Sequence, residues 1–145
     1  MISAADILSA RILVVDDDLD ALRTLQQVLT SAGYTSVACT TDPHAVPELH
    51  REQDFDAILL DVLMPGMDGF EVMEALKPCE RDGYLPVLAL TAESGHRTQA
   101  LRYGAKDFLR KPFDPEELLL RVRNLVEVRL LYKERRIATV MPAAA

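Results

Sequence analysis

Residues 12–18 read ILVVDDD, four consecutive aliphatic side chains followed by three aspartates. A short, unbroken apolar run rich in β-branched residues is typical of a strand buried on both faces. Two similar runs follow, AILL at 57–60 and VLAL at 87–90, and weaker strand patterns occur at 36–40 and 106–110. We therefore predict five strands, of which three are covered on both faces.

Helical periodicity fills the intervals between these strands. Leu22, Leu25, Val28 and Leu29 form an apolar stripe that ends at Gly33, a residue suited to the position after a helix. Shorter helical patterns lie at 43–52, 68–77 and 96–103. Together with a last helix near the C-terminus, they predict an α/β fold in which helices cover both faces of a five-stranded parallel sheet.

The last helical pattern is longer than one layer of a small domain requires. It opens with Asp114, Pro115 and Glu116, which are start signals for a helix, and it continues to about residue 139. We predict an N-terminal extension at 1–10, a folded domain at 11–128, and a helical extension or linker with a tail at 129–145.

The composition of the 145-residue chain is that of an ordinary soluble protein, with 49% hydrophobic and 27% charged residues. Only two cysteines are present, which argues against a disulfide framework and favours a reducing compartment. No apolar run approaches the roughly 18 residues of a membrane span, and the first residues do not resemble a signal peptide. We therefore expect a cytoplasmic protein without membrane contact.

The net charge is −7, and the basic residues are concentrated from residue 115 onward, where six Lys or Arg face four Glu. The remainder of the chain is correspondingly acidic. An acidic surface disfavours direct binding of nucleic acid, because contacts with phosphate groups dominate such binding. It favours a metal cation or a basic partner surface.

Polar residues stand where the apolar strands end. Asp16 and Asp17 follow the first strand, Asp61 the third, Thr91 the fourth and Lys111 the fifth. In a parallel sheet these ends lie at one edge, so three carboxylates converge and repel one another unless a divalent cation such as Mg²⁺ binds them. Asp61 is placed to act as a nucleophile that forms an acyl phosphate, while Lys111 and Thr91 could hold phosphoryl oxygens.

Each of these residues alone has a simpler explanation. A single aspartate at a strand end is more often a helix cap, and Asp18 is expected to cap the helix after the first strand. A lone threonine or lysine there carries almost no functional signal. The hypothesis depends on the joint arrangement of acids, hydroxyl and lysine.

Four motifs, VVDDD, LLDVLMPGMDG, LALTA and LRKPFDPEEL, occur in this order and resemble the receiver domain of two-component response regulators over residues 11 to about 128. The resemblance implies a flavodoxin-like (βα)5 receiver fold with strand order 2-1-3-4-5, here with an extended C-terminal helix. It also implies a signalling phosphoacceptor rather than an enzyme. Such a protein takes a phosphoryl group from a sensor histidine kinase or phosphotransfer protein and switches conformation to control a partner or an output domain.

The resemblance assigns four residues to phosphorylation and metal binding. Asp61 is the phosphoacceptor, and Mg²⁺ is the implied cofactor. Asp17 is a direct ligand of the ion, Asp16 holds it mainly through water, and the backbone carbonyl of Leu63 is the remaining protein ligand.

The resemblance assigns further residues to the phosphoryl group and the switch. The Thr91 hydroxyl bonds the phosphoryl group, Lys111 pairs with it, and Phe108 is the switch aromatic that turns inward when Thr91 moves. The Lys111–Pro112 bond is expected to be cis. In the loop after the third strand, Pro65, Gly66 and Gly69 are expected to shape the backbone through positive φ at glycine.

Two functions from other classes remain. An aspartyl phosphohydrolase would use Asp16 and Asp18 as a DxD motif, but this leaves Asp61 unexplained. A degenerate receiver that only docks would not need all the site residues. A flavodoxin is disfavoured because no phosphate-cradling loop follows the first strand.

The end of the chain suggests self-association. Val126, Leu130, Lys133, Ile137 and Val140 are spaced by 4, 3, 4 and 3 residues, which is a heptad seam interrupted by a lysine. We predict a homodimer through the C-terminal helix, with a frayed, solvated tail as the alternative. The three histidines, His44, His50 and His96, are expected at the surface.

Overall fold

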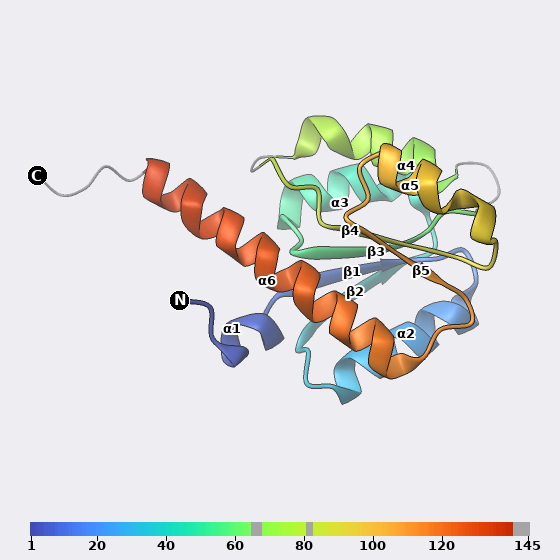
Figure 1. Cartoon of the computed structure of the whole chain (residues 1–145), viewed down its shortest axis with the longest axis horizontal. Coiled ribbons are helices and arrows are strands. Elements are labelled where there is room, and N and C mark those ends of the chain that lie inside the picture. Colours follow the sequence, from blue (N-terminus) through green and yellow to red (C-terminus); the bar gives the residue numbers. More distant parts are fainter. Residues whose placement is uncertain (65–67, 81–82, 141–145) are drawn as a thin grey trace, which may run out of the picture.

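A computed structural model describes residues 1–64, 68–80 and 83–140, and the side chains of residues 94 and 136–140 lie outside this description. Its centre is a parallel sheet of five strands in the order β2-β1-β3-β4-β5 (Figure 1). The strands are β1 (Arg11–Val15), β2 (Ser36–Thr40), β3 (Ala57–Asp61), β4 (Val87–Thr91) and β5 (Asp107–Arg110). The predicted α/β fold and strand order are confirmed.

Helices cover both faces of the sheet. The helices are α1 (Ala4–Leu8), α2 (Leu19–Ser31), α3 (Val46–Gln53), α4 (Gly69–Leu76), α5 (Arg97–Arg102) and α6 (Pro115–Val140), with short 3₁₀ turns at Pro43–Ala45, Lys77–Cys79 and Ser94–His96. Figure 1 shows α3, α4 and α5 on one face and α1, α2 and α6 on the other. The Asp18 carboxylate accepts a hydrogen bond from the Asp20 N–H at 3.0 Å, so Asp18 is the predicted cap of α2.

The continuous apolar runs are explained by two cores, one on each face of the sheet. Along β1, Leu13 and Val15 belong to the core under α3, α4 and α5, whereas Ile12 and Val14 belong to the core under α2 and α6. All four side chains are at most 1% exposed. Since neighbouring residues of a strand point to opposite faces, a strand covered on both sides has no position for a polar side chain until it ends.

The N-terminal segment contains a helix that the apolar pattern did not predict. Ser3 and Asp6 form a reciprocal capping box at the start of α1, with backbone-to-side-chain distances of 2.9 and 3.1 Å. Ile7 is buried in the core under α6, and the Leu8 carbonyl accepts a hydrogen bond from the Thr35 N–H. Residues 1–10 therefore pack on the sheet domain.

The first half of α6 covers the sheet, and its second half is tied to the opposite edge from the predicted site. Arg129 is fully buried and donates to Asp54 Oδ1 at 2.7 Å and to the Tyr84 carbonyl at 3.1 Å. One turn later, Lys133 Nζ donates to the Asp54 carbonyl at 3.1 Å and to the Asp56 carboxylate. Arg129 and Lys133 thus contact the domain closely, although the 128/129 domain boundary itself stays a prediction.

The structure corrects two expectations. Val126 is fully buried and Leu130 packs against the core, so these seam positions face the domain rather than a second helix; Ile137 and Val140 side chains lie outside the described residues. His50 is also not at the surface: it is 1% exposed, and its Nδ1 accepts the Phe55 N–H at 3.1 Å.

Among the helices of the described ranges, none combines the length and apolarity needed to cross a membrane.

Candidate functional site

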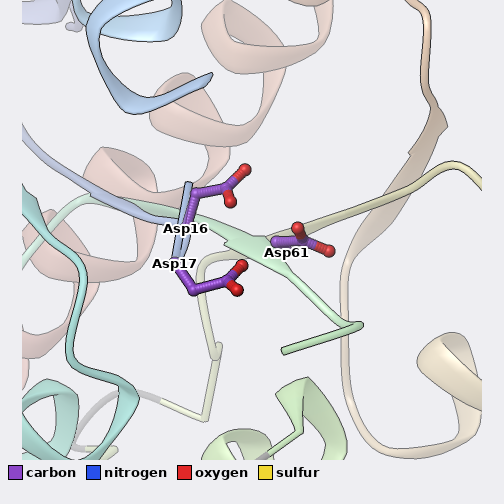
Figure 2. Close-up of side chains that lie close together, drawn as sticks. All are labelled: Asp16, Asp17 and Asp61. Atoms are coloured by element: carbon purple, nitrogen blue, oxygen red, sulfur yellow. The ribbon is translucent and has the colours of Figure 1, made fainter. Parts of the chain in front are cut away.

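The predicted acidic residues meet at the carboxyl edge of the sheet. Asp16 and Asp17 directly follow β1, and Asp61 is the last residue of β3. One carboxylate oxygen from each lies within 4.8 Å of the other two, and Figure 2 shows the three side chains close together at the ends of β1 and β3. Asp16 and Asp61 are buried, whereas Asp17 is exposed. The site is therefore open to solvent on the Asp17 side.

Backbone hydrogen bonds orient the buried carboxylates. Asp16 Oδ1 accepts from the Asp18 N–H at 3.0 Å, and Asp61 Oδ1 accepts from the Leu63 N–H at 3.0 Å. Each carboxylate is thus held by the amide two residues further along, and its second oxygen remains for other partners. Because Asp18 itself is used as the cap of α2, a phosphohydrolase motif built on Asp16 and Asp18 receives no support.

Lys111 enters the site from the loop after β5. Its Nζ lies 2.7 Å from Asp16 Oδ2 and 3.3 Å from Asp61 Oδ2, and its own N–H donates to the Thr91 carbonyl at 2.8 Å. The Lys111–Pro112 peptide bond is cis, as expected. The structure therefore brings Lys111 together with two of the three carboxylates.

The charges in the site shift two pKa values. Burial is the main cause that raises the pKa of Asp61, and the nearby Asp16 charge adds to it, while the Leu63 N–H and Lys111 oppose the shift. For Lys111, burial alone would lower the pKa, but the hydrogen bond to Asp16 and the charges of Asp61 and Asp16 raise it. The pKa of Lys111 and the pKa of Asp61 are thus both raised, the first by its acidic partners and the second chiefly by burial.

The donor set fits a hard divalent cation. Three carboxylates supply oxygen ligands, the exposed Asp17 leaves room for water, and a cation would relieve the repulsion between Asp16 and Asp61. Leu63 follows Asp61 by two residues and is 38% exposed. Its carbonyl as a further ligand stays a prediction.

Thr91 and Phe108 lie on the neighbouring strands, as predicted. Thr91 is the last residue of β4 and fully buried, and its Oγ1 accepts the Glu93 N–H at 3.2 Å, which leaves the hydroxyl hydrogen for another acceptor. Phe108 pairs with Ala89 in the sheet and is only 9% exposed. In this structure the predicted switch aromatic is therefore already turned inward.

The expectation of positive φ at Gly69 is wrong. Within the described ranges the glycines with positive φ are Gly33, Gly83 and Gly104, and Pro65 and Gly66 lie outside those ranges. At Gly69 the constraint is a close approach of α4 to the backbone that follows Asp61. The sequence contained a signal for this close approach, because a glycine at the first position of a helix has no side chain to keep another backbone at a distance.

Comparisons with known proteins agree with this geometry. Residues 12–123 match the family described as "Response regulator receiver domain". The chain is 44% identical over 131 residues to the response regulator PleD of Caulobacter vibrioides, and this match covers 89% of the chain and 29% of PleD. It is 43% identical over 121 residues to the response regulator MprA of Mycobacterium ulcerans, covering 82% of the chain and 51% of MprA. The chain thus spans about half or less of these curated relatives.

Solved structures show the same fold. A putative response regulator from Chloroflexus aurantiacus has a TM-score of 0.76 and 32% identity, covering 82% of this chain and 98% of that one. The receiver domain of the sensor histidine kinase PA1611 from Pseudomonas aeruginosa, described with a magnesium ion coordinated in its active site cleft, has a TM-score of 0.74 and 30% identity, covering 82% and 98%.

Proposed function

Because this chain belongs to the response regulator receiver family, we propose that it accepts a phosphoryl group on Asp61 in a Mg²⁺-dependent reaction. The donor would be a sensor histidine kinase or phosphotransfer protein. The observation that carries the proposal is the assembly of Asp16, Asp17, Asp61 and Lys111 around one space at the edge of the sheet. The magnesium ion described for the PA1611 receiver supports the choice of metal.

The residues would divide the transfer among them. A carboxylate oxygen of Asp61 attacks phosphorus, the bond to the donor nitrogen breaks, and the new bond makes an acyl phosphate. Asp16, Asp17, Asp61 and the Leu63 carbonyl would hold Mg²⁺, which would supply positive charge to the phosphoryl oxygens. Lys111 would leave Asp61 for a phosphoryl oxygen, and the free hydroxyl hydrogen of Thr91 would be donated to another.

The result would be a signal rather than turnover of an external substrate. We propose that phosphorylation shifts a two-state equilibrium in which Thr91 moves and the packing of Phe108 on β5 changes, and that this change controls a partner or a downstream output domain. Phe108 starts buried, so the change would be read as repacking within the core. A phosphate mimic should therefore shift the NMR signals of β4, α5 and β5.

We propose that the protein is cytoplasmic and dimerises through α6. The seam expected from spacing is used by the domain itself, but the opposite side of α6 exposes Leu120, Val128 and Leu131, which are 58%, 37% and 49% exposed. Large apolar side chains gathered on one helix favour a partner surface. A second copy is the simplest partner, because each chain brings the same surface.

Phosphorylation is tested with a small phosphodonor, followed by gel retardation of the acyl phosphate and its cleavage by hydroxylamine. Wild-type protein should be labelled with Mg²⁺ and not after chelation by EDTA. Asp61→Asn should abolish labelling, and Asp17→Asn should raise the Mg²⁺ concentration required. Wild-type labelling of Asp61→Asn that resists hydroxylamine would contradict the assignment of Asp61. Folded wild-type protein that binds Mg²⁺ but is never labelled would favour the degenerate docking module.

A further inference from the structure

Gly69, the first residue of α4, touches the backbone that follows the candidate phosphoacceptor. Its N–H donates to the Val62 carbonyl at 2.9 Å. A Cβ atom at position 69 would lie 2.4 Å from Val62 Cα, 2.9 Å from Val62 Cγ1 and 3.0 Å from the Asp61 carbonyl oxygen. Real Cβ atoms essentially never approach a neighbour below 3.0 Å, so any side chain here would force apart α4 and residues 61–62.

Both sides of this contact are held in place by other interactions. Val62 is fully buried, and its N–H donates to the Leu90 carbonyl of β4 at 3.0 Å. On the other side, the Asp68 carboxylate caps α4 by accepting the Glu71 N–H at 2.9 Å. The fully buried side chains of α4, which pack in the core under it, are Val72, Met73 and Leu76. Leu63, the residue after Val62, has a side chain that is 38% exposed, so its place depends on its backbone contacts more than on burial.

We propose that Gly69 is a positioning residue for the metal and phosphoacceptor site. Because it has no side chain, α4 begins close enough to hold the Val62 carbonyl. This contact fixes the backbone at Leu63, whose N–H orients the Asp61 carboxylate at 3.0 Å and whose carbonyl would be a further protein ligand of the ion. The inference rests on the proposed function, because it concerns the same site.

The test compares Gly69→Ala with Gly95→Ala. A Cβ at Gly95 would have no neighbour within 4 Å, and its φ is not positive, so this variant adds the same methyl group without a clash. Mg²⁺ is titrated into each ¹⁵N-labelled protein and followed by the amide signals of Asp61 and Leu63. Gly69→Ala should bind Mg²⁺ about tenfold more weakly, as expected when a group supporting a ligand is displaced. In the metal-free protein, the Leu63 amide proton should shift upfield, because its hydrogen bond to Asp61 lengthens. Gly95→Ala should match the wild type in both measurements.

Labelling by a small phosphodonor separates positioning from a general loss of structure. The Gly69→Ala protein should need more Mg²⁺ for half-maximal labelling, while its rate at saturating Mg²⁺ recovers most of the wild-type value. If the variant is unfolded in plain buffer, the titration is repeated in trimethylamine N-oxide, which favours the compact state.

Wild-type Mg²⁺ affinity and an unshifted Leu63 amide in folded Gly69→Ala protein would overturn the inference, whatever its thermal stability. A wild-type protein that binds no Mg²⁺ would instead contradict the proposed function. The two failures are therefore distinguishable.

Discussion

Arg129 Nη2 lies 2.7 Å from Asp54 Oδ1, and no part of the Arg129 side chain reaches solvent. Asp54 is the residue after α3, and its φ of 51° places it in the left-handed region. The pair therefore joins α6 to a backbone turn that precedes β3, at the edge of the sheet away from the acidic site. A buried cation needs this kind of partner, since its desolvation is otherwise uncompensated.

We first predict that Asp54→Asn destabilises the protein by about 2 kcal/mol, below the 3–5 kcal/mol typical of a broken buried pair because Asp54 is partly exposed. Asparagine also tolerates the left-handed region, so the change removes charge without straining the backbone. Urea unfolding measures the effect. Glu48→Gln, which breaks the exposed pair with Arg51, is the control and should change stability little. Equal changes in the free energy of unfolding for the two variants would show that the buried Arg129–Asp54 pair stabilises the protein no more than an exposed pair does.

Asp61→Asn should stabilise the metal-free protein at pH 7. The pKa of Asp61 is raised, chiefly by burial. Asp61 therefore contributes to the stability of the folded protein when the pH is below its unfolded-state pKa. This contribution is lost as the pH rises through the folded-state pKa. The difference between variant and wild type should therefore vanish as the pH falls below about the ordinary value of 3.8. Melting temperatures in EDTA across this range provide the measurement. If the variant melts at a lower temperature than the wild type at pH 7, the predicted stabilisation is wrong.

Lys111→Met should bind Mg²⁺ more tightly and accept a phosphoryl group less well. The ammonium group lies 2.7 Å from Asp16 and 3.3 Å from Asp61, so it competes with a cation for the same carboxylates. Removing one charge at this range should tighten Mg²⁺ binding about tenfold. The raised pKa of Lys111 keeps the group charged at neutral pH, so the comparison holds there. Calorimetric titration with Mg²⁺ gives the affinity, and weaker binding by the variant would contradict this account of the site.

Leu131→Glu should separate a dimer into monomers without loss of stability or labelling. Leu131 is 49% exposed, whereas its neighbour Leu130 packs against the core. Leu130→Glu is therefore the contrasting variant and should lower the melting temperature. Sedimentation at tens of micromolar distinguishes the cases. Wild-type protein that sediments as a monomer, with and without a phosphate mimic, would rule out the dimer.

The site could be predicted because its signal is local in the sequence. An apolar strand with an acid, a hydroxyl or a lysine at its end identifies both the strand and the polar edge, and the parallel sheet then brings Asp16, Asp61 and Lys111 together. Two buried cores explain why the strand patterns were unbroken. These features need no knowledge of which side chains touch.

The docking of α6 could not be predicted in this way. Arg129 and Asp54 are 75 residues apart, and a basic residue near a helix end is equally consistent with solvent exposure. The burial of His50 was likewise not visible in the sequence, because its contact with Phe55, whose N–H donates to His50 Nδ1, forms where α3 gives way to β3. From spacing alone we predicted that Val126 and Leu130 pack against a second helix, whereas in the structure these side chains pack against the sheet domain.

The length of α6 has a mechanical consequence. Its 26 residues form a rod about 39 Å long, which starts at Pro115, four residues after Lys111, and passes the far edge of the sheet at Lys133. A tilt of about 5° at its first turn would carry the last turn about 3 Å sideways. The contacts of Arg129 and Lys133 with Asp54 would resist this tilt. A small rearrangement beside Lys111 can therefore displace the end of α6 by a larger distance only if the contacts of Arg129 and Lys133 stretch or break.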